Sequence, residues 1–125
     1  MDAIIPNQLR VLNRLRCSRW HDPMTDDWTL GDWGNAFGGE AGELQNVVKK
    51  LRRHESGASL TYNTPERDAL LAKFEEEVAD VLLYLDLLCW KAGVSPNQVI
   101  RGLRDKFNLV SQAQGWDELQ WDGKP

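Results

Sequence analysis

Two long stretches of the chain have apolar residues at helical spacing, and each carries acidic residues on its apolar face. Read as a helix with about 3.6 residues per turn, residues 30–53 place Glu40 and Glu43 among the apolar side chains. These are Trp33, Ala36, Phe37, Leu44, Val47, Val48 and Leu51. A charge that is buried without a partner is strongly destabilising. We therefore expect a cation to meet these carboxylates.

Residues 66–91 give the strongest helical pattern and repeat this arrangement. Glu77 and Asp80 share a face with Leu70, Phe74, Val81, Tyr84, Leu85 and Leu88. Residues three apart are neighbours on a helix surface, so each helix presents a pair of acids. Four convergent carboxylates suit a hard divalent cation such as Mg²⁺, and Mn²⁺ can take its place. We predict that Glu40, Glu43, Glu77 and Asp80 hold this ion. The alternative is that they are solvated acids on helix surfaces.

Two further helices are expected, near residues 7–19 and 96–113. Their inner stripes are predicted to be Leu9, Leu12 and Leu15 in the first and Ile100, Leu103, Phe107 and Val110 in the last. No stretch shows the alternating pattern of a strand. The pattern therefore predicts an all-α fold resembling a four-helix bundle.

Capping signals set the expected helix ends. Thr29 with Asp32 and Ser95 with Gln98 have the spacing of capping boxes, and Gly93 is expected to stop the third helix. Glycines also recur inside the second helix, at positions 31, 34, 38 and 42. Interior glycines weaken a helix, so we expect another backbone or a ligand to approach closely there.

Length and charge limit the classes of protein. A chain of 125 residues suits one domain, so we expect a single domain over 1–125, with a core at 7–113 and a loosely ordered tail at 114–125. The net charge of −4 argues against general nucleic-acid binding. No apolar run is long enough for a membrane span, and Cys17 and Cys89 match no metal spacing. These features favour a cytoplasmic protein with no membrane partner.

Several apolar residues lie away from the acid face. Leu82, Leu83 and Trp90 are the main examples, and a chain of this size has little room to bury them. We therefore expect a homodimer or a homotetramer.

Four short motifs occur in a distinctive order. They are Gly39-Glu-Ala-Gly-Glu-Leu44, Glu76-Glu-Val-Ala-Asp-Val-Leu-Leu-Tyr-Leu85, Lys106-Phe-Asn108 and Gly115-Trp116. This set resembles the MazG-like all-α nucleotide pyrophosphohydrolases, which pair an E-x-x-E helix with an E-x-x-D helix. The resemblance covers about residues 9 to 116. Many members have glutamate at the position of Gly39. The chain resembles the dCTP pyrophosphatase branch in having glycine there. The loop around residues 54–65 is longer than in many members.

The resemblance implies an oligomeric MazG-like fold and Mg²⁺-dependent cleavage between the α- and β-phosphates of a nucleoside triphosphate. The products would be a nucleoside monophosphate and pyrophosphate. Glu40 or Glu43 would activate the attacking water. Lys106 and Asn108 would hold phosphate oxygens, while Lys50 would either reach a phosphate or pair with Glu43.

The base site is expected to use aromatic residues. Trp20 and Trp33 are candidates to stack on the nucleobase, with His21 beside it. The alternatives are that the tryptophans fill the end of the bundle and that His21 lies on a surface loop.

Two rival functions remain. A ferritin-like di-iron bundle expects Glu-x-x-His pairs, which this chain lacks. The stronger rival is a non-catalytic helical module that binds a nucleotide or a protein partner without turnover.

Overall fold

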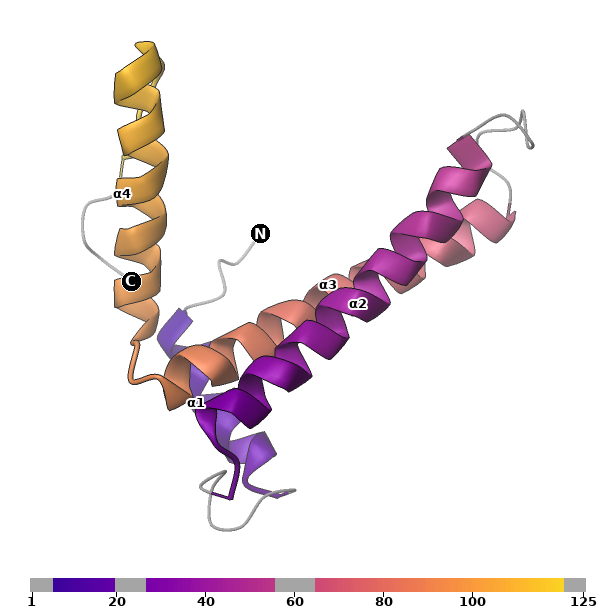
Figure 1. Cartoon of the computed structure of the whole chain (residues 1–125), viewed down its shortest axis with the longest axis horizontal. Helices are drawn as coiled ribbons and strands as arrows, with labels where there is room; N and C mark the ends of the chain where they lie inside the picture. Colours follow the sequence, from indigo (N-terminus) through magenta and orange to yellow (C-terminus); the bar gives the residue numbers. More distant parts are fainter. Residues whose placement is uncertain (1–5, 20–26, 56–64, 121–125) are drawn as a thin grey trace. The chain divides into compact units, whose positions relative to one another are not determined.

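The computed structural model describes residues 6–19, 27–55 and 65–120, and these residues are organised into helices (Figure 1). The helices are α1 Pro6–Cys17, α2 Leu30–Glu55, α3 Pro65–Lys91 and α4 Pro96–Gln114. The described part of the chain contains no strand. The prediction of an all-α protein is therefore confirmed, and each helix begins and ends within two residues of its expected position.

The chain divides into two compact units, which are described separately. The hairpin unit comprises residues 28–88, and the terminal unit comprises residues 1–27 and 89–125. The hairpin unit contains α2 and most of α3. The terminal unit contains α1, α4 and the last residues of α3.

In the hairpin unit, α2 and α3 pack side by side in opposite directions (Figure 1). The rings of Trp33 and Tyr84 lie 6.3 Å apart between their centres, and Glu40 lies close to Glu77 further along. Residue numbers rise along α2 while they fall along α3, which is the signature of an antiparallel pair. Trp33 is 1% exposed, so the tryptophan predicted on the inner face of α2 is a core residue.

The capping box expected at the start of α2 is present. The Thr29 backbone N–H donates to Asp32 Oδ2 at 2.8 Å, and the Asp32 backbone N–H donates to Thr29 Oγ1 at 3.1 Å. These bonds satisfy donors that the first turn of a helix leaves open. The Thr29 backbone N–H and the Thr29 hydroxyl both donate to the Asp32 carboxylate, and these two bonds lower the pKa of Asp32. The cap fixes where α2 begins, ten residues before the E-x-x-E pair at Glu40.

The glycines of α2 do not mark a close approach within the described chain. A Cβ atom added at Gly34, Gly38 or Gly42 would meet no described atom within 4 Å. The expectation that a neighbouring backbone requires these glycines is wrong for the described part of this single chain.

In the terminal unit, two arginines of α1 contact the end of α3. Gly93, at φ 76°, ends α3 as expected. Arg10 Nη1 then donates to the Val94 carbonyl at 2.9 Å. The Arg14 guanidinium lies 4.5 Å from the centre of the Trp90 ring, a cation–π geometry. Trp90, expected to be free for an oligomer contact, is thus half-buried and covered by Arg14.

These contacts rotate α1 away from its predicted orientation. Leu12 and Leu15 are 57% and 53% exposed, whereas Asn13 and Cys17 are buried. The expected inner stripe is therefore wrong for both leucines. The reason is that α1 turns its Arg10 side toward the end of α3, and Asn13 and Cys17 follow on that same side at helical spacing.

The residues after α4 fold back on the helix. Gly115 adopts a left-handed conformation with φ 70°, and the Trp116 N–H donates to the Ser111 carbonyl at 2.8 Å. The Leu119 N–H then donates to Asn108 Oδ1 at 2.8 Å, while Asn108 Nδ2 donates to the Leu119 carbonyl at 3.1 Å. The segment 116–120 is thus attached to α4, in contrast to the loosely ordered tail that we expected.

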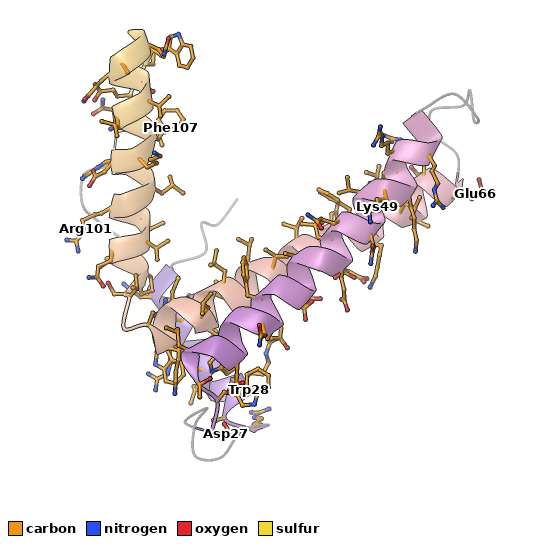
Figure 2. The ribbon with its side chains drawn as sticks, viewed as in Figure 1. Asp27, Trp28, Lys49, Glu66, Arg101 and Phe107 are labelled. Carbon is orange, nitrogen blue, oxygen red and sulfur yellow. The ribbon has the colours of Figure 1, made fainter. Side chains whose placement is uncertain are left out.

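This attachment uses the polar side of α4. Ser111 is buried there, whereas two residues of the predicted inner stripe are exposed. Leu103 is 59% exposed, and Phe107, labelled in Figure 2, is 47% exposed. The expectation that these two residues are buried is therefore wrong within the single chain.

The contact between Asn108 and Leu119 gives a testable prediction. The variant Asn108→Leu removes both hydrogen bonds, so the backbone amide of Leu119 should exchange with deuterium at least about tenfold faster, as expected for loss of local protection. Hydrogen exchange measured by NMR reports this amide directly. Gln112→Ala, an exposed change on the same helix, is the control and should leave the rate unchanged. Equal rates in Asn108→Leu and the wild type would show that Asn108 does not hold the segment.

Candidate metal centre

Three of the four predicted metal ligands come together in the hairpin unit. Glu40 and Glu43 of α2 and Glu77 of α3 each offer a carboxylate oxygen, and these three oxygens all lie within 4.8 Å of one another. This spacing lets one ion contact all three. We call these residues the acid cluster.

The acid cluster follows from the helix periods and the antiparallel packing. Glu40 and Glu43 are one turn apart on α2, and the pairing that places Trp33 against Tyr84 also brings Glu77 opposite them. Exposure is graded across the cluster: Glu77 is buried, Glu40 is half-buried and Glu43 is exposed. The cluster therefore extends from the helix interface to the surface, where an ion and a ligand can enter.

The buried carboxylate of Glu77 is only half satisfied. Its Oε1 forms an ion pair with Lys73 Nζ at 3.0 Å. Its Oε2 is buried and accepts no hydrogen bond from any described residue. A buried polar atom without a partner costs about 1–3 kcal/mol, and a charged one costs more. A cation in the cluster would remove this cost, so the donor set and the unsatisfied oxygen both fit a hard divalent ion.

Electrostatic crowding acts on Glu40. Burial raises the pKa of this carboxyl above its usual value, and the charges of Glu43, Asp80 and Glu77 raise it further. Ionised Glu40 is therefore destabilising in the metal-free fold. A bound cation would reverse the effect of the neighbouring charges, because an opposite charge favours the ionised form.

Asp80, the fourth predicted ligand, lies near the acid cluster but outside the group of three oxygens. It is half-buried on α3, one turn beyond Glu77. Its charge still contributes to the raised pKa of Glu40, which places it within electrostatic reach of that carboxyl. Its role as a ligand remains a prediction.

Lys73 is the residue that the sequence analysis missed. Its ammonium group forms ion pairs with both Glu77 and Glu76. The signal was its position four residues before Glu77, which makes the two side chains neighbours on a helix. Lys50, which was considered for pairing with Glu43, is exposed and forms no ion pair with Glu43 among the described residues.

The predicted base-binding residues are only partly described. Trp20 and His21 lie outside the described residues. Trp33 is buried between Trp28, at 4.6 Å between ring centres, and Tyr84. This burial favours the alternative in which Trp33 packs the core of the hairpin unit.

The predicted phosphate ligands Lys106 and Asn108 belong to the terminal unit. Lys106 is exposed on α4. The Asn108 amide is engaged with the Leu119 backbone. Asn108 therefore has a structural contact that the sequence did not indicate.

Comparison of the chain with known protein families, with characterised proteins and with solved structures gives no match. Among the described helices, none combines the length and the apolar character that crossing a membrane requires.

The raised pKa of Glu40 predicts an unusual effect of mutation. Because the folded-state pKa lies above the unfolded one, ionisation weakens the fold as pH rises through these values, and the penalty is absent in acid. Without divalent cations, Glu40→Gln should therefore melt at a higher temperature than the wild type at neutral pH, and the difference should vanish in acid. Thermal melts in a chelating buffer measure both conditions.

Glu75→Gln, an exposed acid change on α3, is the matched control and should not reproduce the stabilisation. A Glu40→Gln protein that melts below the wild type at neutral pH would show that this carboxylate makes a stabilising contact instead.

Proposed function

We propose that the chain is a divalent-cation-dependent nucleoside triphosphate pyrophosphohydrolase that releases pyrophosphate and a nucleoside monophosphate. The observation that carries the proposal is the convergence of Glu40, Glu43 and Glu77 within 4.8 Å, with one buried oxygen of Glu77 unsatisfied by the described residues. A bound cation would offset the repulsion between these carboxylates and would give the buried oxygen a partner.

The order of the motifs supports the same function. The three clustered acids are members of the E-x-x-E and E-x-x-D pairs on which the resemblance to MazG-like pyrophosphohydrolases depends. Two antiparallel helices present these pairs to each other, as the resemblance implied.

The side chains of the cluster suit distinct roles. Glu40, Glu43, Glu77 and Asp80 would hold the cation. Glu40 or Glu43, whichever is not fully engaged by the ion, would take the proton from the attacking water. When bound, Mg²⁺ or Mn²⁺ supplies charge neutralisation for the phosphates and lowers the pKa of a coordinated water.

The remaining substrate contacts belong to the proposal as well. Lys50 and Lys106 are exposed cations that would contact phosphate oxygens. Asn108 would do so only after leaving the Leu119 backbone, since both groups of its amide are engaged there. Trp20 and His21 are the proposed base contacts. Trp33, being buried, would support the packing of the hairpin unit.

We also propose that the chain works as a homodimer or homotetramer. The support is the apolar surface that the described chain leaves uncovered, including Leu82, Leu103 and Phe107. Packing between copies would remove this surface from water.

The direct test is a pyrophosphate-release assay with canonical and modified NTPs and dNTPs in the presence of Mg²⁺. We expect turnover that requires the metal, and a loss of about 10²–10⁴-fold for Glu40→Gln if this residue is the general base. Glu43→Gln and Asp80→Asn should abolish turnover, since they remove proposed ligands without changing side-chain size. Glu75→Gln, outside the acid cluster, should retain full activity.

The outcome also separates the two classes of function. Nucleotide binding without pyrophosphate release, across the whole substrate panel, would favour the non-catalytic module. Turnover that persists in a chelating buffer would contradict the role given to the acid cluster.

A further inference from the structure

Lys73 connects the acid cluster to the surface of α3. Its Nζ lies 3.0 Å from Glu77 Oε1 and 3.2 Å from Glu76 Oε2. One ammonium group thus bridges a buried carboxylate that belongs to the cluster and an exposed carboxylate that does not. A lysine ammonium group is charged at neutral pH.

The three side chains differ in what holds them in place. The Glu77 side chain is 5% exposed, whereas Lys73 and Glu76 are 53% and 68% exposed. Glu77 is thus enclosed within the hairpin unit, whereas Lys73 and Glu76 extend into solvent. We therefore expect packing to hold Glu77 in place when Lys73 moves away from it.

The two oxygens of Glu77 have different surroundings. Lys73 occupies Oε1, and Oε2 is the buried atom that accepts no hydrogen bond from the described residues. Removing one partner of a buried charge leaves an uncompensated ion, which is strongly destabilising. Without a metal, Lys73 is the only described cation that contacts this carboxylate.

We infer that Lys73 is the resident counter-cation of the acid cluster: it compensates Glu77 in the metal-free protein and remains on Glu76 alone when a divalent ion binds. The inference rests on the proposed metal site and adds a residue that tunes it. Lys73 would lower the affinity of the acid cluster for the ion. Its charge would offset the repulsion between the carboxylates when no ion is bound.

The sign of the effect follows from Coulomb's law. The ammonium group of Lys73, held against one oxygen of Glu77, repels a divalent ion that approaches the other oxygen of the same carboxylate. For separations of about 6 Å in a water-like dielectric, this repulsion corresponds to about a tenfold weaker affinity. Removing the ammonium should therefore tighten metal binding while weakening the metal-free fold.

A different role for Lys73 predicts the opposite change in metal affinity. If Lys73 oriented Glu77, its loss would misplace a ligand and weaken metal binding, by about 10–100-fold for typical supporting residues. The near-complete burial of Glu77 argues against this role, and the direction of the affinity change separates the two.

The experiment measures binding of Mg²⁺ and Mn²⁺ alone, without nucleotide, by calorimetry and by thermal melts at low ionic strength. Lys73→Met removes the charge and keeps an unbranched side chain of similar length. Lys73→Arg keeps the charge. Lys49→Met removes a charge from an exposed lysine toward the C-terminal end of α2 (Figure 2), and controls for the change in net charge.

We expect Lys73→Met to melt below the wild type in a chelating buffer, to bind the ion about tenfold more tightly and to gain more stability from it. Lys73→Arg and Lys49→Met should stay close to the wild type. Unchanged or weaker binding by Lys73→Met, with normal binding by the wild type, would overturn the inference alone. Failure of the wild type to bind either ion would overturn the metal site and the inference together.

Discussion

The antiparallel packing of α2 against α3 is the contact on which the candidate site depends. Trp33 and Tyr84 contact each other across this interface, and the same pairing brings Glu40 and Glu43 opposite Glu77. Burial of apolar side chains provides the favourable free energy, and the acids are carried into position because they lie on the same helix faces. Packing thus brings together charges that would separate if they were free to move.

This packing leaves unfavourable electrostatic interactions in the metal-free acid cluster. The metal-free cluster contains a carboxyl group with a raised pKa at Glu40 and an unsatisfied oxygen at Glu77, and Lys73 offsets only part of the charge. A divalent cation that binds the folded chain would relieve both features and stabilise the fold in proportion to its occupancy. Under the proposed function, stability and activity would compete at this site, since a change that removes repulsion would also remove a ligand.

Local features of the structure were predictable from the sequence, and contacts between distant segments were less so. The helix ends follow from capping boxes at Thr29 and Ser95, whose hydrogen bonds span three residues. The acid cluster was predictable because its residues belong to the E-x-x-E and E-x-x-D pairs, which helical spacing places on the apolar faces of two helices. The outward orientation of Leu12 was not, because apolar spacing cannot reveal that Arg10 would turn its side of α1 toward Val94, which lies 84 positions away. The bond between Asn108 and Leu119 likewise depends on a chain reversal after Gly115.

The central claim is that the acid cluster binds a divalent cation, and paramagnetic broadening by Mn²⁺ tests it most directly. In NMR spectra of the labelled chain, substoichiometric Mn²⁺ should first remove the amide signals flanking Glu40, Glu43 and Glu77. Signals near Glu66 and Asp68, exposed acids about 14–16 Å from Glu77 along α3, should broaden less. Excess Mg²⁺ should restore the lost signals. Broadening that begins at Glu66 and Asp68, or that spreads evenly over all exposed acids, would contradict a metal site at the α2–α3 interface.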